Sequence, residues 1–235
     1  MTRLTKKILN KLFYFYRLIN HTISKRFLKK KYIAHHGLQR NGTNFLLHAL
    51  RHLDVDVINE FDKKRNKPQH KHFRWYSSKE NIPEQIYAEY FNSLIAENVH
   101  EVNALCNFPR DTKHIVIYKE ENSSIVSVLN WGIRVGWFNS KQDALNAYYL
   151  YKLDYRLYYS FWKKLANHNP DYVQLLSFEK LIESNNEIAD ILKNLDIKFN
   201  ITDLNLSFKE LPQSPRSRKN IIAISDIEKL AKSNK

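Results

Sequence analysis

The chain has 235 residues, of which 43% are hydrophobic and 26% charged, which fits one ordinary domain with a sizeable core and excludes general disorder. Its single cysteine, Cys106, excludes an internal disulfide and indicates a reducing compartment, and no Cys/His spacing is typical of a structural metal site, so we expect no metal. The formal net charge of +14 lies mainly in residues 1–53, which hold twelve Lys and Arg and no acidic residue. This asymmetry favours an anionic partner.

Residues 1–31 form a basic segment that is predicted to contain an amphipathic helix. Its apolar residues Ile8, Leu12, Phe15 and Ile19 recur every three or four positions. The segment is too charged to span a membrane and lacks the pattern of a signal peptide, so we expect a cytoplasmic protein. Two interpretations stay open: peripheral contact with an anionic membrane on its inner face, or packing against the protein's own domain or a partner.

Residues 32–235 are predicted to form one α/β domain, because short apolar runs alternate with longer stretches of helical period. Parallel strands follow from this alternation. In chain order we expect a strand over 32–38, a helix over 43–53, a strand over 54–58, a polar loop to about 81, a helix over 83–99, a strand over 114–118, a helix over 121–136, a helix over 141–167, a strand over 172–176, a helix from 178, a basic loop over 208–220 and a short final helix.

The turn after the first predicted strand has the glycine spacing of a phosphate-binding loop. Gly37 and Gly42 are placed as in a Walker A motif, where backbone N–H groups and a helix N-terminus surround an anion. Thr43 and Asn44 stand where an ATPase needs Lys and Ser/Thr, and the cation is Arg40 inside the loop. We therefore predict a P-loop NTPase-like three-layer fold with a mostly parallel central sheet, and a phosphate donor that reacts without metal.

Three segments together give a family resemblance. The loop from Gln39 to Leu46 resembles the phosphosulfate loop of P-loop sulfotransferases, which use 3′-phosphoadenosine 5′-phosphosulfate (PAPS), with Asn41 in the place of a serine. The eight-residue step from Lys119 to Ser127 resembles the 3′-phosphate motif of that family. The segment 176–181 is similar to its Tyr-Glu-Asp-Leu element, with Phe178 for Tyr and Lys180 for Asp.

The resemblance implies a role for each matching residue. The 5′-phosphosulfate would be held by the loop, and Arg40 would stabilise charge on the leaving phosphate; the alternative is that Arg40 only caps a turn. Lys119 and Ser127 would hold the 3′-phosphate. Arg216 and Arg218 could reach the nucleotide from the basic loop or be solvated charges. The nucleotide-binding residues implied in the first loop are Gln39, Arg40, Asn41, Gly42, Thr43, Asn44 and Phe45.

Sulfonate transfer to a hydroxyl needs a general base, and the polar loop offers three candidates. We favour His72, because bacterial members of the family often carry a similar Lys-His-Phe segment and because an imidazole titrates near neutral pH. His70 and Glu60 remain alternatives. Lys71 would stabilise the transferring sulfonate.

The chain is thus expected to be a PAPS-dependent sulfotransferase that resembles bacterial glycan and glycolipid sulfotransferases and acts on a hydroxyl of a saccharide acceptor. Two rivals stay open. An ATP-dependent kinase of the P-loop class would need Mg²⁺, and a non-catalytic module would bind nucleic acid through the first 31 residues. Under the favoured interpretation no nucleic-acid partner is expected.

Overall fold

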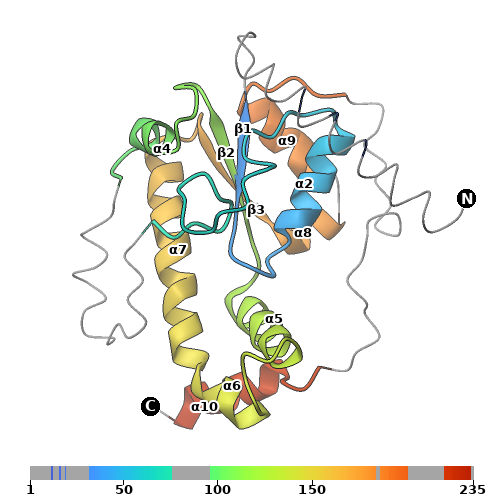
Figure 1. Ribbon diagram of the computed structural model, residues 1–235, viewed down its shortest axis with the longest axis vertical. Helices are drawn as coiled ribbons and strands as arrows, with labels where there is room; N and C mark the ends of the chain where they lie inside the picture. The colour runs from blue at the N-terminus through green and yellow to red at the C-terminus, as the bar shows by residue number, and fades with distance from the viewer. Residues whose placement is uncertain are drawn as a thin grey trace, which may run out of the picture.

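The computed structural model describes residues 32–75, 96–183, 186–200 and 220–233, together with Leu12, Tyr16 and Ile19. It confirms an α/β fold built on a parallel sheet with helices around it (Figure 1). The elements in chain order are β1 (Ile33–His36), α2 (Thr43–His52), α4 (Val99–Leu105), β2 (Lys113–Tyr118), α5 (Glu121–Arg134), α6 (Lys141–Asn146), α7 (Tyr148–His168), β3 (Val173–Ser177), α8 (Phe178–Glu183), α9 (Asn186–Asn194) and α10 (Ile224–Ser233).

The described sheet has three strands in the order β1-β2-β3, and both pairings are parallel. His36 at the end of β1 is in register with Val116, and Tyr118 at the end of β2 is in register with Ser177. The carboxyl ends of all three strands therefore meet at one edge of the sheet, which is where α/β proteins place their ligands.

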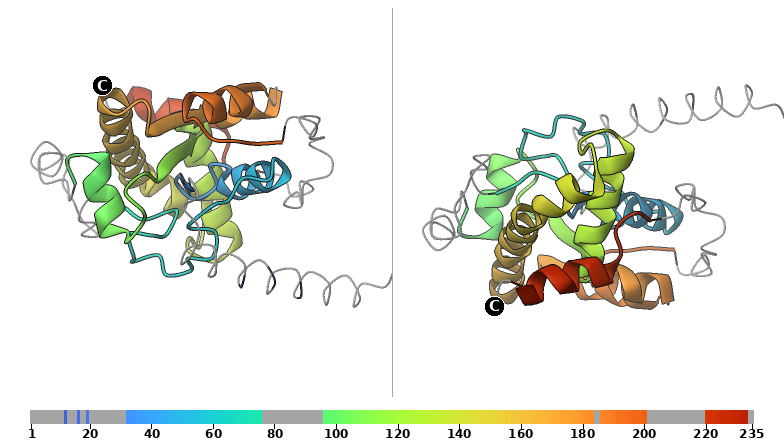
Figure 2. Two further views of the ribbon diagram at one scale, coloured as in Figure 1. Left: turned by 90° about the horizontal axis from the view of Figure 1, so that it is seen from above. Right: turned by 90° about the horizontal axis from the view of Figure 1, so that it is seen from below.

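Alternating residues of the strands face two separate cores, one on each side of the sheet, as strand geometry requires. On one face Ala34, Val116 and Val173 pack with apolar residues of α4 and α7. On the other face Ile33, Ile117 and Leu176 pack with α2, α8 and α9. Figure 2, seen from above, shows the sheet between these two groups of helices.

A third cluster lies away from the sheet and fixes α5. Ile125 and Leu129 of α5 pack with Ala144, Tyr148 and Ile222. The Asn130 amide donates to the Ile222 carbonyl at 2.8 Å, and its Oδ1 accepts from the N–H groups of residues 221 and 222. The view from below in Figure 2 shows α10 beside this cluster. The position of α5 matters because its first turn follows the edge where the strands end.

The prediction of a strand over 54–58 was wrong. This segment forms only one isolated parallel bridge, between Ile33 and Val57. The chain turns immediately afterwards, with the Glu60 N–H donating to the Val57 carbonyl at 3.3 Å. Val55 and Val57 are nevertheless buried, as their alternation with aspartates predicts.

The helix predicted over 141–167 is two helices that meet at Ala147. The break buries both Ala144 and Tyr148 in the third cluster, and neither Gly nor Pro marks it in the sequence. Helix α4 was not predicted, although Asn98 caps it and Glu101 stands three residues later, as in a capping box. Most of the helix expected over 83–99 and of the segment 1–31 lies outside the described residues, as does the loop 208–219.

Candidate anion-binding site

Three segments that follow the strands lie together at the carboxyl edge of the sheet. Gly37 follows β1, Lys119 follows β2, and Phe178 begins α8 directly after β3. A Cβ atom added to Gly42 would lie 2.3 Å from the Phe178 ring, and the Lys119 Nζ lies 4.5 Å from the centre of the same ring. The loop that ends at Gly42 and the cation that follows β2 therefore both contact Phe178.

The two loop glycines allow the loop backbone to lie close to its neighbours. Gly37 lies against the backbone of β2, and Gly42 lies against the Phe178 ring. A Cβ atom at Gly37 would lie 2.6 Å from the Ile117 carbonyl oxygen of β2, so no larger residue fits without a shift. Gly42 has φ +90°, and Arg40 between the glycines has φ +68°, a left-handed conformation that is uncommon outside glycine. The loop is thus tightly curved and packed on the sheet edge.

The curved loop directs unpaired N–H groups towards the start of α2. Gly42 is the N-cap of this helix and offers no side-chain cap. Within the described ranges, the N–H groups of Arg40, Gly42, Thr43 and Asn44 have no hydrogen-bond acceptor. Free N–H groups at the positive end of a helix dipole favour an anion there.

Positive side chains converge on the same place. The Arg40 guanidinium is half-buried, and in the described part of the chain its buried Nε has no hydrogen-bond partner. Burial and the nearby charge of Arg134 lower the pKa of Arg40. Burial and the charge of Arg40 likewise lower the pKa of Lys119, against an opposing effect from Glu179. Arg40 and Lys119 therefore lie close enough to repel each other, which an anion between them would relieve.

Helix α5 presents Ser127 and Arg134 on one face, since residues seven apart lie two turns along a helix. Ser127 is half-buried. Arg134 donates to the Asn220 Oδ1 at 3.1 Å and lies close enough to Arg40 for the two charges to interact. Arg134 is a cation at the site that the sequence analysis missed, although its spacing from Ser127 is visible in the sequence.

The acidic residues beside Lys119 are engaged elsewhere. The Glu120 carboxylate caps α5 by accepting from the Ser123 N–H at 2.8 Å. Glu121 forms an ion pair with Arg156 at 3.1 Å. The charges of Glu120 and Glu121 are therefore partly offset by the helix dipole and by Arg156, so that Glu179 is the carboxylate that acts on Lys119.

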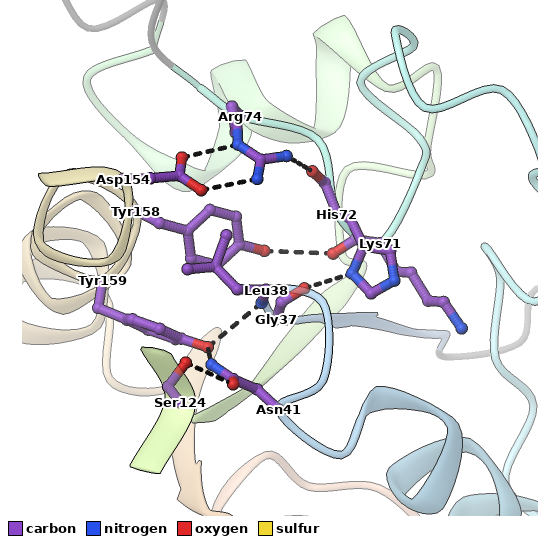
Figure 3. A network of polar contacts seen from close by, with 10 residues as sticks. All are labelled: Gly37, Leu38, Asn41, Lys71, His72, Arg74, Ser124, Asp154, Tyr158 and Tyr159. Carbon is purple, nitrogen blue, oxygen red and sulfur yellow. Dashed lines mark hydrogen bonds and ion pairs between the residues drawn. The ribbon is translucent and has the colours of Figure 1, made fainter. Parts of the chain in front are cut away.

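The loop is held by a buried network around Asn41 and Tyr159 of α7 (Figure 3). The Asn41 amide donates to the Tyr159 hydroxyl at 2.6 Å, and its Oδ1 accepts from the Ser124 hydroxyl at 2.6 Å. The same tyrosine oxygen accepts from the Leu38 N–H at 3.2 Å and donates to the Ile117 carbonyl at 3.0 Å. Asn41 therefore serves to fix the loop, because its side chain is buried and satisfied within the protein.

The segment 70–74 lies directly against this loop, although it is distant in sequence (Figure 3). The Gly37 N–H donates to the Lys71 carbonyl at 3.1 Å, and the His72 Nδ1 lies 2.6 Å from the Gly37 carbonyl oxygen. A carbonyl only accepts, so the His72 Nδ1 carries the proton and its Nε2 keeps a lone pair. Burial and nearby cations lower the pKa of His72 to about 3, which keeps the ring neutral. A neutral imidazole with one basic nitrogen can accept a proton.

Lys71 joins the same segment to the first turn of α2. Its Nζ donates to the Asn44 Oδ1 at 2.5 Å, so the ammonium stands beside the free N–H groups of the loop. Burial, followed by the charge of Arg51, lowers the pKa of Lys71 to about 8. The lysine therefore remains mostly charged at neutral pH and adds a fourth cation to those contributed by Arg40, Lys119 and Arg134.

Two side chains anchor the segment to α7. Arg74 forms a bidentate ion pair with Asp154, with both N···O distances 2.7 Å, and its Nη1 donates to the His72 carbonyl at 3.4 Å. The Tyr158 hydroxyl donates to the Lys71 carbonyl at 3.2 Å. A bidentate ion pair fixes the orientation of the two side chains as well as bringing their charges together. The segment that carries Lys71 and His72 is therefore held against α7.

The two alternative bases are less available than His72. The His70 Nδ1 accepts from the His72 N–H at 3.1 Å, so its remaining nitrogen carries the proton. Glu60 is ion-paired with Arg51, and its side chain is only 2% exposed. Of the two histidines, His72 is therefore the one with a ring nitrogen that can accept a proton, while Glu60 is buried in an ion pair.

The other predicted residues are placed as follows. Gln39 faces Arg65, and its amide oxygen accepts from Nη1 at 2.5 Å and from Nη2 at 3.1 Å in the orientation that satisfies both groups. Thr43 is buried, and Phe45 contacts Phe178 edge to face with ring centres 5.9 Å apart. Arg216 and Arg218 lie outside the described residues.

Buried histidines behind the loop are structural. Asn103 donates its amide to the Thr112 carbonyl at 3.1 Å, which leaves its Oδ1 to accept from the His114 Nε2 at 2.9 Å. The His114 Nδ1 then accepts from the His36 Nε2 at 3.0 Å. His35 hydrogen bonds Asn59 through its backbone and its ring. In the part of the chain that is described, no three His, Cys, Asp or Glu side chains are grouped so that they could hold a metal ion.

Comparisons with protein-family models, curated proteins and solved structures give no match to this chain, so the fold is assigned only as α/β with a parallel sheet. The described helices include none that combines the length and the apolar character needed to cross a membrane.

Proposed function

We propose that the protein is a sulfotransferase that moves a sulfonate from PAPS to a hydroxyl of a saccharide acceptor. The observation that carries the proposal is the pair formed by Arg40 and Lys119. Both are partly buried cations on the loop and strand end that meet at Phe178, and neither has a carboxylate at ion-pair distance within the described residues. The charge of Arg40 lowers the pKa of Lys119, although that of Glu179 opposes this shift. An arrangement of this kind is stabilised by a ligand with several negative charges.

A nucleotide with phosphates on both sides of its ribose suits this distribution of charge. The free N–H groups of the loop, with Arg40, would hold the 5′-phosphosulfate. Lys119 and Ser127 would hold the 3′-phosphate, and Arg134 adds a charge on the same helix face as Ser127. The left-handed backbone at Arg40 supports a role beyond capping a turn, because strained residues concentrate at functional sites.

The reaction would be an in-line displacement on sulfur. The acceptor oxygen forms a bond to sulfur while the bond from sulfur to the bridging oxygen of the 5′-phosphate breaks. The acceptor proton passes to the Nε2 of His72, and adenosine 3′,5′-bisphosphate leaves. Arg40 would stabilise charge on the departing phosphate and Lys71 charge on the sulfonate. An anion bound beside His72 would offset the neighbouring cations and raise its pKa, which makes it a better base when donor is present.

A thermal-shift experiment tests the nucleotide preference. The full chain is heated with adenosine 3′,5′-bisphosphate, adenosine 5′-phosphate, ATP, and ATP with Mg²⁺. A ligand at 100 times its dissociation constant stabilises by about 2.7 kcal/mol. We expect a large shift from the bisphosphate alone. A larger shift from ATP with Mg²⁺ would overturn the proposal in favour of a kinase.

Two variants locate the 3′-phosphate. Lys119→Ala and Ser127→Ala should reduce the shift given by the bisphosphate and leave any small shift from adenosine 5′-phosphate unchanged. Lys180→Ala is the matched control, because Lys180 also lies near the start of α8 but is exposed and paired with Glu187 at 3.3 Å. Equal losses in the control and in Lys119→Ala would contradict the assignment.

The base is tested by transfer of labelled sulfonate from PAPS to extracted cell-envelope glycans. His72→Ala should abolish transfer while the bisphosphate shift stays nearly intact. His168→Ala, which removes an exposed histidine at the end of α7, serves as the control and should leave transfer unchanged. Retained turnover in His72→Ala would move the role to His70 or Glu60.

A further inference from the structure

The segment that leads to His72 carries a dense basic patch. Lys63, Lys64, Arg65 and Lys67 place four cations in five consecutive residues, and all four side chains are exposed. Asp62 precedes them, so the segment 62–67 keeps a clear positive excess. The patch belongs to the same loop as Lys71 and His72 rather than to the segment that follows β2, where Lys119 lies.

Arg65 connects this patch to the site. Its guanidinium is held by the amide oxygen of Gln39, the residue before Arg40, at 2.5 and 3.1 Å. The charge of Arg65 also reaches both His70 and His72, where it lowers the pKa of each ring. Arg65 is therefore linked to the loop through Gln39 and acts electrostatically on His72. Its hydrogen-bond partner is a neutral amide, which does not cancel its positive charge.

The cations of this region fall into two classes. Arg51 and Arg74 are neutralised by the carboxylates of Glu60 and Asp154. Arg65 and Lys71 instead hydrogen bond the amide oxygens of Gln39, in the orientation given above, and of Asn44, and neither forms an ion pair within the described residues. Two positive charges without a carboxylate partner among the described residues therefore act on His72. Lys71 contacts the first turn of α2 and is therefore suited to bind the sulfonate of the donor. Arg65 and its exposed neighbours then remain to bind the acceptor.

We propose that the acceptor is an acidic saccharide, whose carboxylate or phosphate group is held by Arg65 together with the exposed Lys64 and Lys67. This rests on the proposed sulfotransferase function and narrows its acceptor class. A guanidinium with its fork of donors suits either anion, and long-range attraction from the patch speeds the encounter with a charged ligand.

The test measures binding to protein saturated with adenosine 3′,5′-bisphosphate, so that the donor-side cations are already occupied. The first pair of probes is an oligosaccharide of alternating uronic acid and hexosamine and the same oligosaccharide after reduction of its carboxylates to alcohols. The second pair is a mannose trisaccharide with and without a 6-phosphate. Titration calorimetry should give at least about ten-fold tighter binding for one charged member than for its neutral partner, weakening as salt rises.

Variants then locate the contact. Arg65→Gln should weaken binding of the preferred charged probe about five- to ten-fold and leave binding of its neutral partner unchanged. Lys67→Gln should give a smaller loss of the same kind without touching Gln39. Lys163→Gln on α7 is the control, because Lys163 is also exposed but belongs to another element. The Lys67→Gln protein should bind adenosine 3′,5′-bisphosphate as the wild type does.

The outcomes distinguish the proposed acceptor class from the proposed sulfotransferase function. Tighter binding of the carboxylated or phosphorylated probe that depends on Arg65 supports it and names the anion. Equal binding of charged and neutral members in both pairs, absence of binding by all four probes, or equal losses in Arg65→Gln and Lys163→Gln would overturn it. Failure to bind adenosine 3′,5′-bisphosphate would instead overturn the sulfotransferase proposal.

Discussion

Replacing Tyr159 by phenylalanine should destabilise the protein strongly, because one hydroxyl holds three groups of the loop and sheet. It accepts from the Leu38 N–H and the Asn41 amide and donates to the Ile117 carbonyl. An unsatisfied buried polar group costs roughly 1–3 kcal/mol, so two orphaned donors predict a loss of roughly 2–4 kcal/mol after partial relaxation. For a chain of this size that corresponds to a fall in Tm of roughly 5–15 °C.

The matched control is Tyr155→Phe, one turn earlier on α7. Among the described residues its hydroxyl makes one hydrogen bond, to the Lys119 carbonyl at 2.6 Å, so its loss should cost only about 1 kcal/mol. Urea denaturation gives both free energies of unfolding, and titration with adenosine 3′,5′-bisphosphate reports on the loop. We expect Tyr159→Phe to lose both stability and nucleotide affinity. If Tyr155→Phe is as destabilising as Tyr159→Phe, the network does not hold the loop as argued.

Three further predictions follow from other parts of the fold. Gly42→Ala should lose nucleotide binding, because its Cβ would meet the Phe178 ring at 2.3 Å, whereas Gly136→Ala, at a similar positive φ with nothing within 4 Å, should keep it; equal binding by both would refute the steric argument. The buried Cys106, whose pKa burial raises to about 12, should react with iodoacetamide only after unfolding, and rapid labelling of the native protein would contradict its burial. Stability should fall as pH drops from 6.5, because burial lowers the pKa of His35 and His114 to about 3 in the native state, so the unfolded chain binds more protons there. For each such histidine the free energy of unfolding should fall by about 1.4 kcal/mol per pH unit below 6.5. Urea midpoints that stay constant between pH 7.5 and 5.5 would count against this.

The elements that the sequence predicted correctly are those with strong local signals. The apolar run before Gly37 and the helical pattern after Gly42 correspond to β1 and α2, and the run over 114–118 corresponds to β2. The expected strand over 54–58 failed for a nonlocal reason. Its buried valines have the right alternation, but pairing with β1 depends on where the chain turns after Val57, which periodicity does not encode.

The same distinction applies to the site. Arg40 and Lys119 could be named because each follows a strand within a short motif. Tyr159 lies 118 residues from Asn41, and Ser124 lies 83 residues from it, so nothing local links them. The sequence suggested Ser127 on α5, whereas the serine that contacts the loop is Ser124, one turn earlier. The neutral partners of Arg65 and Lys71 also depend on tertiary packing.

The proposed nucleotide site is tested by a crystal structure of the protein with adenosine 3′,5′-bisphosphate, grown in the presence of EDTA. We expect one nucleotide at the carboxyl edge of the sheet, with its 5′-phosphate on the N–H groups of Arg40, Gly42, Thr43 and Asn44 and beside the Arg40 side chain. Its 3′-phosphate should contact Lys119 and Ser127. A nucleotide that binds elsewhere, or that leaves Arg40 and Lys119 in contact with different ligands, would contradict the account.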